Sequence, residues 1–153
     1  MAQDTLFEGS LQWAGPSSGA AFSYDSFDRT TTIEFAGGAR LQASAPAEFK
    51  GDDALCNPET LMLASLMQCH FLTFMAVASK SGATVLSYRD SGSGRLAMKD
   101  GRMRYVEVIL RPAVVLADSA HMARLATFHD KAHANCFMAN SVNFPVLVQP
   151  PAG

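Results

Sequence analysis

A long, mostly apolar stretch runs from Asn57 to Gly82 and reads NPETLMLASLMQCHFLTFMAVASKSG. Asn57 can cap a helix, and the proline after it suits the first helical position. The chain then stays apolar for most of the stretch, and Lys80, Ser81 and Gly82 are typical of a helix end. We therefore predict one helix of about 35 Å, at 1.5 Å per residue. It is apolar nearly all round, so we expect a sheet or a second subunit to cover it.

The apolar run is also long enough to suggest a membrane span. It carries Ser65, Gln68, His70 and Thr73, however, and polar side chains are costly in lipid. The sequence has no second candidate span, and its first residues, MAQDTLFEGS, lack the basic and apolar regions of a signal peptide. We therefore expect a buried helix, no membrane partner and no signal peptide, with a membrane span as the minor alternative.

The sequence before the helix predicts strands. Residues 30–35 (TTTIEF) are rich in β-branched side chains, and Gly37 and Gly38 favour a turn. Together with residues 39–44 they predict a β-hairpin. Residues 45–56 (APAEFKGDDALC) then read as a loop that leads the chain to the helix.

Strand patterns return after the helix. Residues 83–98 and 102–112 predict a β-meander, with a hairpin turn at Asp100–Gly101. Residues 142–150 (VNFPVLVQP) predict a final short strand, and Pro145 favours a place at the edge of the sheet because proline cannot donate to a ladder.

A second helix is predicted from Ser119 to about Cys136, with Asp118 or Ser119 as its cap. The order of strands, helix, strands, helix and strand predicts an α+β fold with antiparallel sheet. A length of 153 residues suits one domain, residues 1–153, and a composition of 48% hydrophobic and 17% charged residues is typical of a globular chain. The net charge is −2 with scattered Lys and Arg, which argues against a nucleic-acid partner.

Cysteine is sparse and odd in number, with Cys56, Cys69 and Cys136. This is a poor disulfide framework and favours a reducing compartment, so we expect a cytoplasmic protein. Cys69 lies mid-helix, where a thiol stays inert unless a cation favours its thiolate, and inert packing is the simplest interpretation. If Cys136 meets Cys69 in the fold, however, one can attack an oxidant and the other can condense with the resulting sulfenic acid.

A zinc site competes with this redox interpretation. His129 and His133 are four residues apart and share a helix face, and Cys136 follows three residues later. With Cys69 they could form a Cys₂His₂ zinc site.

Glu59 and Arg29 form a further candidate pair. Each has an ordinary interpretation, as a residue favoured by the helix dipole and as a solvated cation. If they pair inside the fold, the carboxylate holds the guanidinium rigidly, and its remaining donors can stabilise a thiolate or a substrate oxygen.

Several of these segments resemble the OsmC/Ohr family, the osmotically inducible protein C and organic hydroperoxide resistance proteins. The opening stretch resembles the family's reactive-cysteine helix, and AHANCFMANSVNFPV resembles its second cysteine segment. VLSYRDSGSGRLAM and RYVEVILRP resemble its central strands. YDSFDRTTTIEFAGG resembles the N-terminal strands of the OsmC-like branch, which has Cys-His at the reactive position. The resemblance runs in the same order from about Tyr24 to Pro150.

The resemblance implies an OsmC-like domain in which antiparallel sheets pack around a long buried helix, as an intertwined homodimer. It implies a thiol peroxidase in which Cys69 is the peroxidatic cysteine and Cys136 the resolving one. Glu59 matches the glutamate of the family's Asn-Pro-Glu. Arg29 is the arginine expected to pair with it, with Arg40 in reserve.

The implied substrates are organic hydroperoxides in preference to hydrogen peroxide. A thiol or dithiol, such as a lipoyl-type dithiol, would be the reductant, with no cofactor or metal. His70 and Gln68 replace the small and aromatic neighbours of the family's cysteine, and Cys56 directly before Asn57 is also a departure. The alternative is a non-redox module of the same fold that binds zinc or a small ligand through Cys and His side chains.

Overall fold

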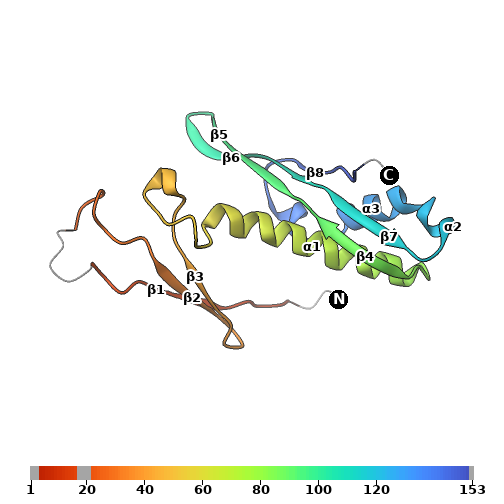
Figure 1. The fold of residues 1–153 in the computed structure, drawn as a ribbon, viewed down its shortest axis with the longest axis horizontal. Helices are drawn as coiled ribbons and strands as arrows, with labels where there is room; N and C mark the ends of the chain where they lie inside the picture. The colour runs from red at the N-terminus through yellow and green to blue at the C-terminus, as the bar shows by residue number, and fades with distance from the viewer. Residues whose placement is uncertain (1–3, 17–21, 152–153) are drawn as a thin grey trace. The chain divides into compact units, whose positions relative to one another are not determined.

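In a computed structural model of the chain, residues 4–16 and 22–151 are described. The chain forms two compact units, Met1–Leu61 and Met62–Gly153. The boundary falls inside the helix α1 (Pro58–Lys80), shown in Figure 1. The expectation that one domain spans residues 1–153 stays a prediction.

The first unit holds a three-stranded antiparallel sheet. Its strands are β1 (Gly9–Gln12), β2 (Thr31–Phe35) and β3 (Arg40–Ala43), in that order. The predicted hairpin is confirmed, because β2 pairs with β3 antiparallel. Gly37 and Gly38 turn the chain with φ of 97° and 88°, a conformation that costs glycine little.

This unit leaves many large apolar side chains exposed. Phe7 is 88% exposed and Leu6 81%. The short 3₁₀ helix η1 (Ala47–Phe49) follows the sheet and buries no residue. The unit therefore does not cover its own apolar surface within one chain.

The helix α1 begins and ends as predicted. At its start the Thr60 amide donates to Asn57 Oδ1 at 2.8 Å, and the Asn57 amide donates to Thr60 Oγ1 at 3.0 Å. This reciprocal pair is a capping box with threonine in the third helical position. At its end Gly82 takes a φ of 74°, and the Ala83 amide donates to the Ala78 carbonyl at 3.0 Å.

Within the chain, α1 is buried along one line only. The fully buried positions are spaced four residues apart and so share one face: Leu66, His70, Phe74 and Ala78. Among the described residues, α1 is the one helix long and apolar enough to cross a membrane, with a hydropathy of 1.7. The core helix of a globular protein meets the same criterion. Only 22% of that apolar window is buried, so most of the helix surface remains to be covered.

The strands after α1 form one long hairpin, and the predicted meander is wrong. Each arm contains two strands: β4 (Val85–Asp90) and β5 (Ser93–Lys99), then β6 (Arg102–Leu110) and β7 (Pro112–Leu116). β4 pairs with β7 and β5 with β6, so the arms run together in Figure 1.

The ladder of this hairpin is interrupted halfway along its arms, where the Arg111 amide donates to Asp90 Oδ1 at 2.8 Å instead of to a backbone carbonyl. The predicted turn at Asp100 and Gly101 is confirmed, with both residues at positive φ.

The last part of the chain departs from the predicted single helix. It forms α2 (Ser119–Met122) and α3 (Leu125–Ala134), because Arg124 leaves helical geometry at a ψ of 6°. Asp118 caps α2 as predicted. After the 3₁₀ helix η2 (Ala139–Ser141), β8 (Val146–Val148) pairs with β6 at the sheet edge, as predicted, but in parallel.

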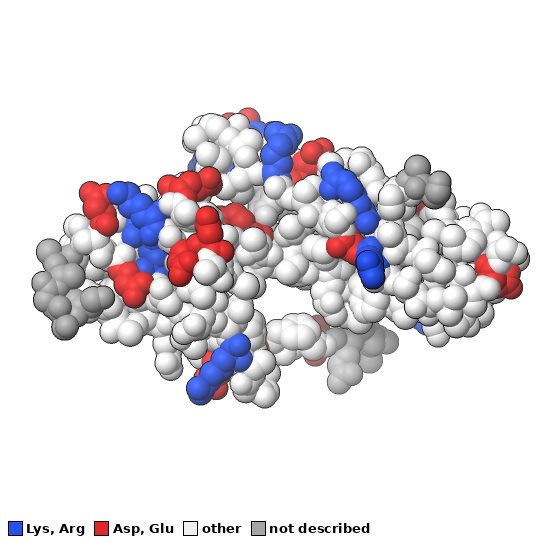
Figure 2. All heavy atoms as spheres, viewed as in Figure 1, with Lys and Arg blue, Asp and Glu red and all other residues white. Residues whose placement is uncertain are grey.

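Two hydrophobic clusters hold the second unit together. One joins Phe74 and Ala78 of α1 to Phe128 and Ala132 of α3 and to β7. The other joins Leu66 of α1 to β6 and β8. The middle of α1 therefore lies between two packed regions. Acidic and basic residues are interspersed on the face shown in Figure 2, where neither sign forms one continuous patch.

Candidate functional site

Cys69 and Cys136 meet in the second unit. Cys69 lies in the middle of α1, and Cys136 follows α3 by two residues. The side chain of Cys136 interacts with that of Cys69, and both cysteines are free. Cys136 is 1% exposed, whereas Cys69 is partly exposed. The structure thus brings together two thiols that are 67 residues apart, which sequence spacing alone could not show.

Backbone amides surround the two sulfur atoms. The Met138 amide donates to Cys69 Sγ at 3.4 Å. The amides of Ala139 and Met138 also donate to the Cys136 sulfur and favour its thiolate. Burial outweighs them and raises the pKa of Cys136 to about 11. Cys136 is therefore a protonated thiol at neutral pH.

An apolar pocket of about 800 Å³ opens beside Cys69. Aliphatic side chains of α1, such as Leu72 and Val77, form one side of it, and Phe137 forms part of the other. Two lysines, Lys80 and Lys131, also line it, and the described lining contains no carboxylate. The pocket therefore suits an apolar molecule that is neutral or carries a negative charge.

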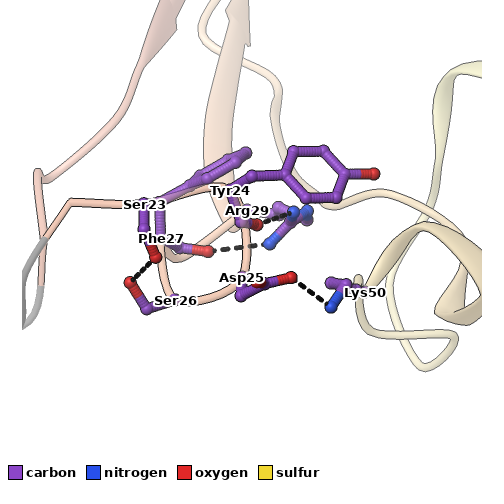
Figure 3. Close-up of polar contacts among 7 residues, drawn as sticks. All are labelled: Ser23, Tyr24, Asp25, Ser26, Phe27, Arg29 and Lys50. Carbon is purple, nitrogen blue, oxygen red and sulfur yellow. Dashed lines mark hydrogen bonds and ion pairs between the residues drawn. The ribbon is translucent and has the colours of Figure 1, made fainter.

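Arg29 lies in the first unit, in the loop before β2. Its guanidinium donates to the carbonyl oxygens of Tyr24 at 2.6 Å and Phe27 at 3.0 Å, as Figure 3 shows. It also lies 3.9 Å from the centroid of the Phe27 ring. A Lys50–Asp25 ion pair borders the same loop in Figure 3. These contacts order the Arg29 side chain before any ligand is present.

The surroundings of Arg29 are also apolar. A pocket of about 560 Å³ in the first unit is lined by Arg29 and by aromatic residues that include Trp13, Tyr24 and Phe27. Arg40, the reserve candidate, instead pairs with Glu34 on the surface at 3.0 Å. Glu59 lies in the first turn of α1, as predicted. The predicted Arg29–Glu59 pairing and its role at Cys69 stay predictions.

The predicted zinc set is not assembled. No group of three or more His, Cys, Asp or Glu side chains within residues 4–16 and 22–151 is arranged to hold a metal ion. His129 instead faces the core, where its Nδ1 lies 3.1 Å from His70 Nε2. Cys69, one residue before His70, lies on another face of α1 and lines the pocket.

This His70–His129 pair is a feature that the sequence interpretation missed. The two rings are 0% and 3% exposed, and their burial lowers the pKa of each to about 4. A signal was available, because His70 lies four residues from Leu66 and four from Phe74 and therefore faces the core. Its partner on α3 could not be deduced from spacing.

Comparisons with known proteins show the family and the fold of this chain. Residues 51–150 match the sequence model of the family described as OsmC-like protein. An uncharacterised protein of Bacillus subtilis, YmaD, is 27% identical over 121 residues, which cover 77% of this chain and 80% of that protein.

Solved structures share the fold. An OsmC-like protein of unknown function from Vibrio cholerae is 31% identical, with a TM-score of 0.88 over 97% of this chain and 100% of that one. An organic hydroperoxide resistance protein, OsmC, from Legionella pneumophila superposes with a TM-score of 0.71 at 16% identity, over 97% of each chain. The fold predicted from the sequence is therefore confirmed, and the chain belongs to the family of OsmC-like proteins.

Proposed function

We propose that the protein is a thiol peroxidase that reduces organic hydroperoxides through Cys69 and Cys136. The observation that carries the proposal is the contact of the two thiols beside an apolar pocket. The organic hydroperoxide resistance protein among the structural neighbours supports the same chemistry at the level of the family.

The reaction uses only these two sulfurs, a hydroperoxide and a reductant. The Cys69 thiolate attacks the terminal peroxide oxygen, the O–O bond breaks, and the alkoxide leaves and takes a proton to become an alcohol. Cys69 is thereby oxidised to a sulfenic acid. The sulfur of Cys136 then attacks the Cys69 sulfur, the S–O bond breaks, and the leaving hydroxide combines with the Cys136 proton as water. An external thiol or dithiol, for example of the lipoyl type, reduces the disulfide.

The environment of each sulfur suits its role. Cys69 lines the pocket and is reachable by a hydroperoxide. Cys136 is buried and remains a thiol, which protects it from direct oxidation because the thiolate is the reactive form. Arg29, oriented by Glu59, is the cation proposed to favour the Cys69 thiolate. The working form is a homodimer in a reducing compartment, the cytoplasm.

The test is hydroperoxide consumption by the purified protein with a dithiol reductant. We expect cumene hydroperoxide to be consumed faster than hydrogen peroxide. Cys69→Ser abolishes consumption, whereas Cys136→Ser allows one reaction and then stalls or over-oxidises. Cys56→Ser is the matched control and retains turnover. Consumption that survives in Cys69→Ser, or a wild-type protein that consumes no hydroperoxide, contradicts the proposal.

A further inference from the structure

The buried His70–His129 pair has no part in the reaction proposed above. Its rings lie edge to edge, with planes 12° apart and centroids 5.4 Å apart, and Nε2 of His70 lies 3.1 Å from Nδ1 of His129. Phe74 stacks on His129, with centroids 4.6 Å apart. The pair is thus a directional polar contact between α1 and α3 within otherwise apolar packing.

Each histidine is linked through the chain to one of the two sulfurs. His70 follows Cys69 directly on α1. His129 lies on α3, and helical hydrogen bonds continue past the end of α3, where the Cys136 amide donates to the His133 carbonyl at 3.1 Å. A shift of α3 along α1 therefore moves the His129 ring and the Cys136 sulfur together.

Two ring nitrogens of the pair lack a hydrogen bond in the described part of the chain, which argues against a role of the pair in stability. His70 Nδ1 and His129 Nε2 are shielded from solvent and have no hydrogen-bond partner within the described residues. A neutral imidazole has one N–H and one bare nitrogen, so either tautomeric arrangement of the pair leaves one N–H without an acceptor. An unsatisfied buried polar group costs free energy, and an apolar pair of similar shape would avoid that cost.

Apolar contacts alone would hold the two helices less specifically. Hydrophobic packing is not directional, so it tolerates small displacements of one helix along another. A hydrogen bond weakens steeply as its angle and length change. The imidazole pair therefore fixes the position of α3 along α1, at a cost in stability.

We propose that the His70–His129 hydrogen bond positions Cys136 against Cys69 and thereby sets the rate at which the Cys69 sulfenic acid condenses with Cys136. The two histidines are positioning residues and do not contact the hydroperoxide. The inference rests on the proposed function for its chemistry, but the approach of the two sulfurs can also be measured without a peroxide.

The variants separate the hydrogen bond from the volume of the side chain. His70→Leu and His129→Leu remove the hydrogen bond and keep an apolar side chain of similar size. His70→Gln keeps a polar atom near the place of Nε2, and His129→Asn keeps one near the place of Nδ1. The glutamine and asparagine variants are the matched controls that should rescue the function.

The first measurement is a single turnover with one equivalent of cumene hydroperoxide. Peroxide loss reports the sulfenic acid step, and intact mass reports the disulfide. We expect the leucine variants to consume peroxide at the wild-type rate but to form the disulfide at least about tenfold more slowly. A 1 Å misplacement of reacting atoms can lower a reaction rate about 100-fold. Cys69 of the leucine variants should accumulate sulfinic acid in excess peroxide, and urea unfolding should show stability equal to or above that of the wild type.

The second measurement uses diamide, a diazene that oxidises two thiols to a disulfide and is itself reduced to the hydrazine. It reports the approach of Cys69 and Cys136 whether or not the protein is a peroxidase. The same ranking is expected, with the leucine variants slow and the glutamine and asparagine variants near the wild type.

The outcomes are distinct. Wild-type disulfide rates in both leucine variants overturn the inference, and so does a glutamine or asparagine variant as slow as its leucine counterpart. An equal loss in the peroxide step and the disulfide step, or a large loss of stability, means general disruption and also overturns it. If the wild-type protein does not react with peroxide but the variants show the expected ranking with diamide, the peroxidase function is refuted and the positioning role stands.

Discussion

Cys69 and Cys136 differ in exposure although their sulfurs are neighbours. Cys69 is partly exposed at the pocket, and Cys136 is 1% exposed beneath it. In the proposed reaction this asymmetry sets the order in which the two sulfurs react, because an oxidant that enters the pocket meets Cys69 first. The sequence predicted both residues through the family resemblance, but it did not indicate that the second thiol is shielded.

Lys80 and Lys131 are the charged residues that line the pocket. We expect Lys80→Ala and Lys131→Ala to lower kcat/KM for a hydroperoxide of a fatty acid about two- to fivefold each, the effect of an exposed ion pair. The rate with uncharged cumene hydroperoxide should not change, and added salt should reduce the difference between the two substrates. Lys99→Ala, on the far strand β5, is the control. An equal loss with both substrates would mean that these lysines do not recognise charge.

The strongest local patterns in the sequence predict helix caps and turns correctly. The caps of α1, the glycine turn between β2 and β3, and the Asp100–Gly101 turn follow from residues that have few alternatives at those positions. The pairing of the four strands after α1 did not follow. The predicted strand of residues 102–112 ends at Pro112, although Pro112 begins the alternating strand β7.

The break between α2 and α3 was also missed. It occurs at Arg124, and the sequence HMARLA around it contains no glycine or proline to mark it. The contacts of the Arg29 side chain could not be predicted from the sequence either. Its guanidinium bonds to backbone carbonyls, and side-chain patterns carry no information about such contacts.

The histidine pair makes the packing of α1 and α3 sensitive to acid. The pKa of His70 and of His129 falls from 6.5 to about 4 on burial, while Asp130 opposes the shift at His129 and His133 adds to that at His70. Between these pH values the unfolded chain binds more protons, so the free energy of unfolding falls as the pH drops from about 6.5 to 4, by up to about 3 kcal/mol per histidine.

This loss can be measured by urea unfolding at a series of pH values. The double variant His70→Gln, His129→Asn removes both titrating groups, so it should keep more of its stability than the wild type between about pH 6.5 and 4. Parallel pH profiles of the two proteins would show that carboxylates, and not the histidine pair, control the acid limb.

Large apolar side chains are exposed in both units of the molecule. The first unit exposes Phe7 and Phe22, at 88% and 71%, and the second exposes Leu72 on α1 at 55%. Exposed apolar surface of this kind usually marks an interface. The sequence indicated that α1 needs to be covered, since a helix that is apolar nearly all round must pack against a sheet or a second subunit.

We therefore expect light scattering to give the mass of a homodimer for the purified protein. The unfolding temperature of such a homodimer should rise with protein concentration, because association stabilises the folded state by mass action. A monomeric mass together with a concentration-independent unfolding temperature would contradict the homodimer. The uncovered face of α1 would then need another partner.

The Met138 amide, which contacts the sulfurs of both Cys69 and Cys136, has one more consequence. In the proposed cycle, this single proton lies where the charge and bonding of two sulfur atoms change. Its nuclear magnetic resonance frequency should therefore differ among the dithiol, sulfenic acid and disulfide forms. The chain thus carries a native label for its own oxidation state, which can be followed without a dye or a coupled enzyme.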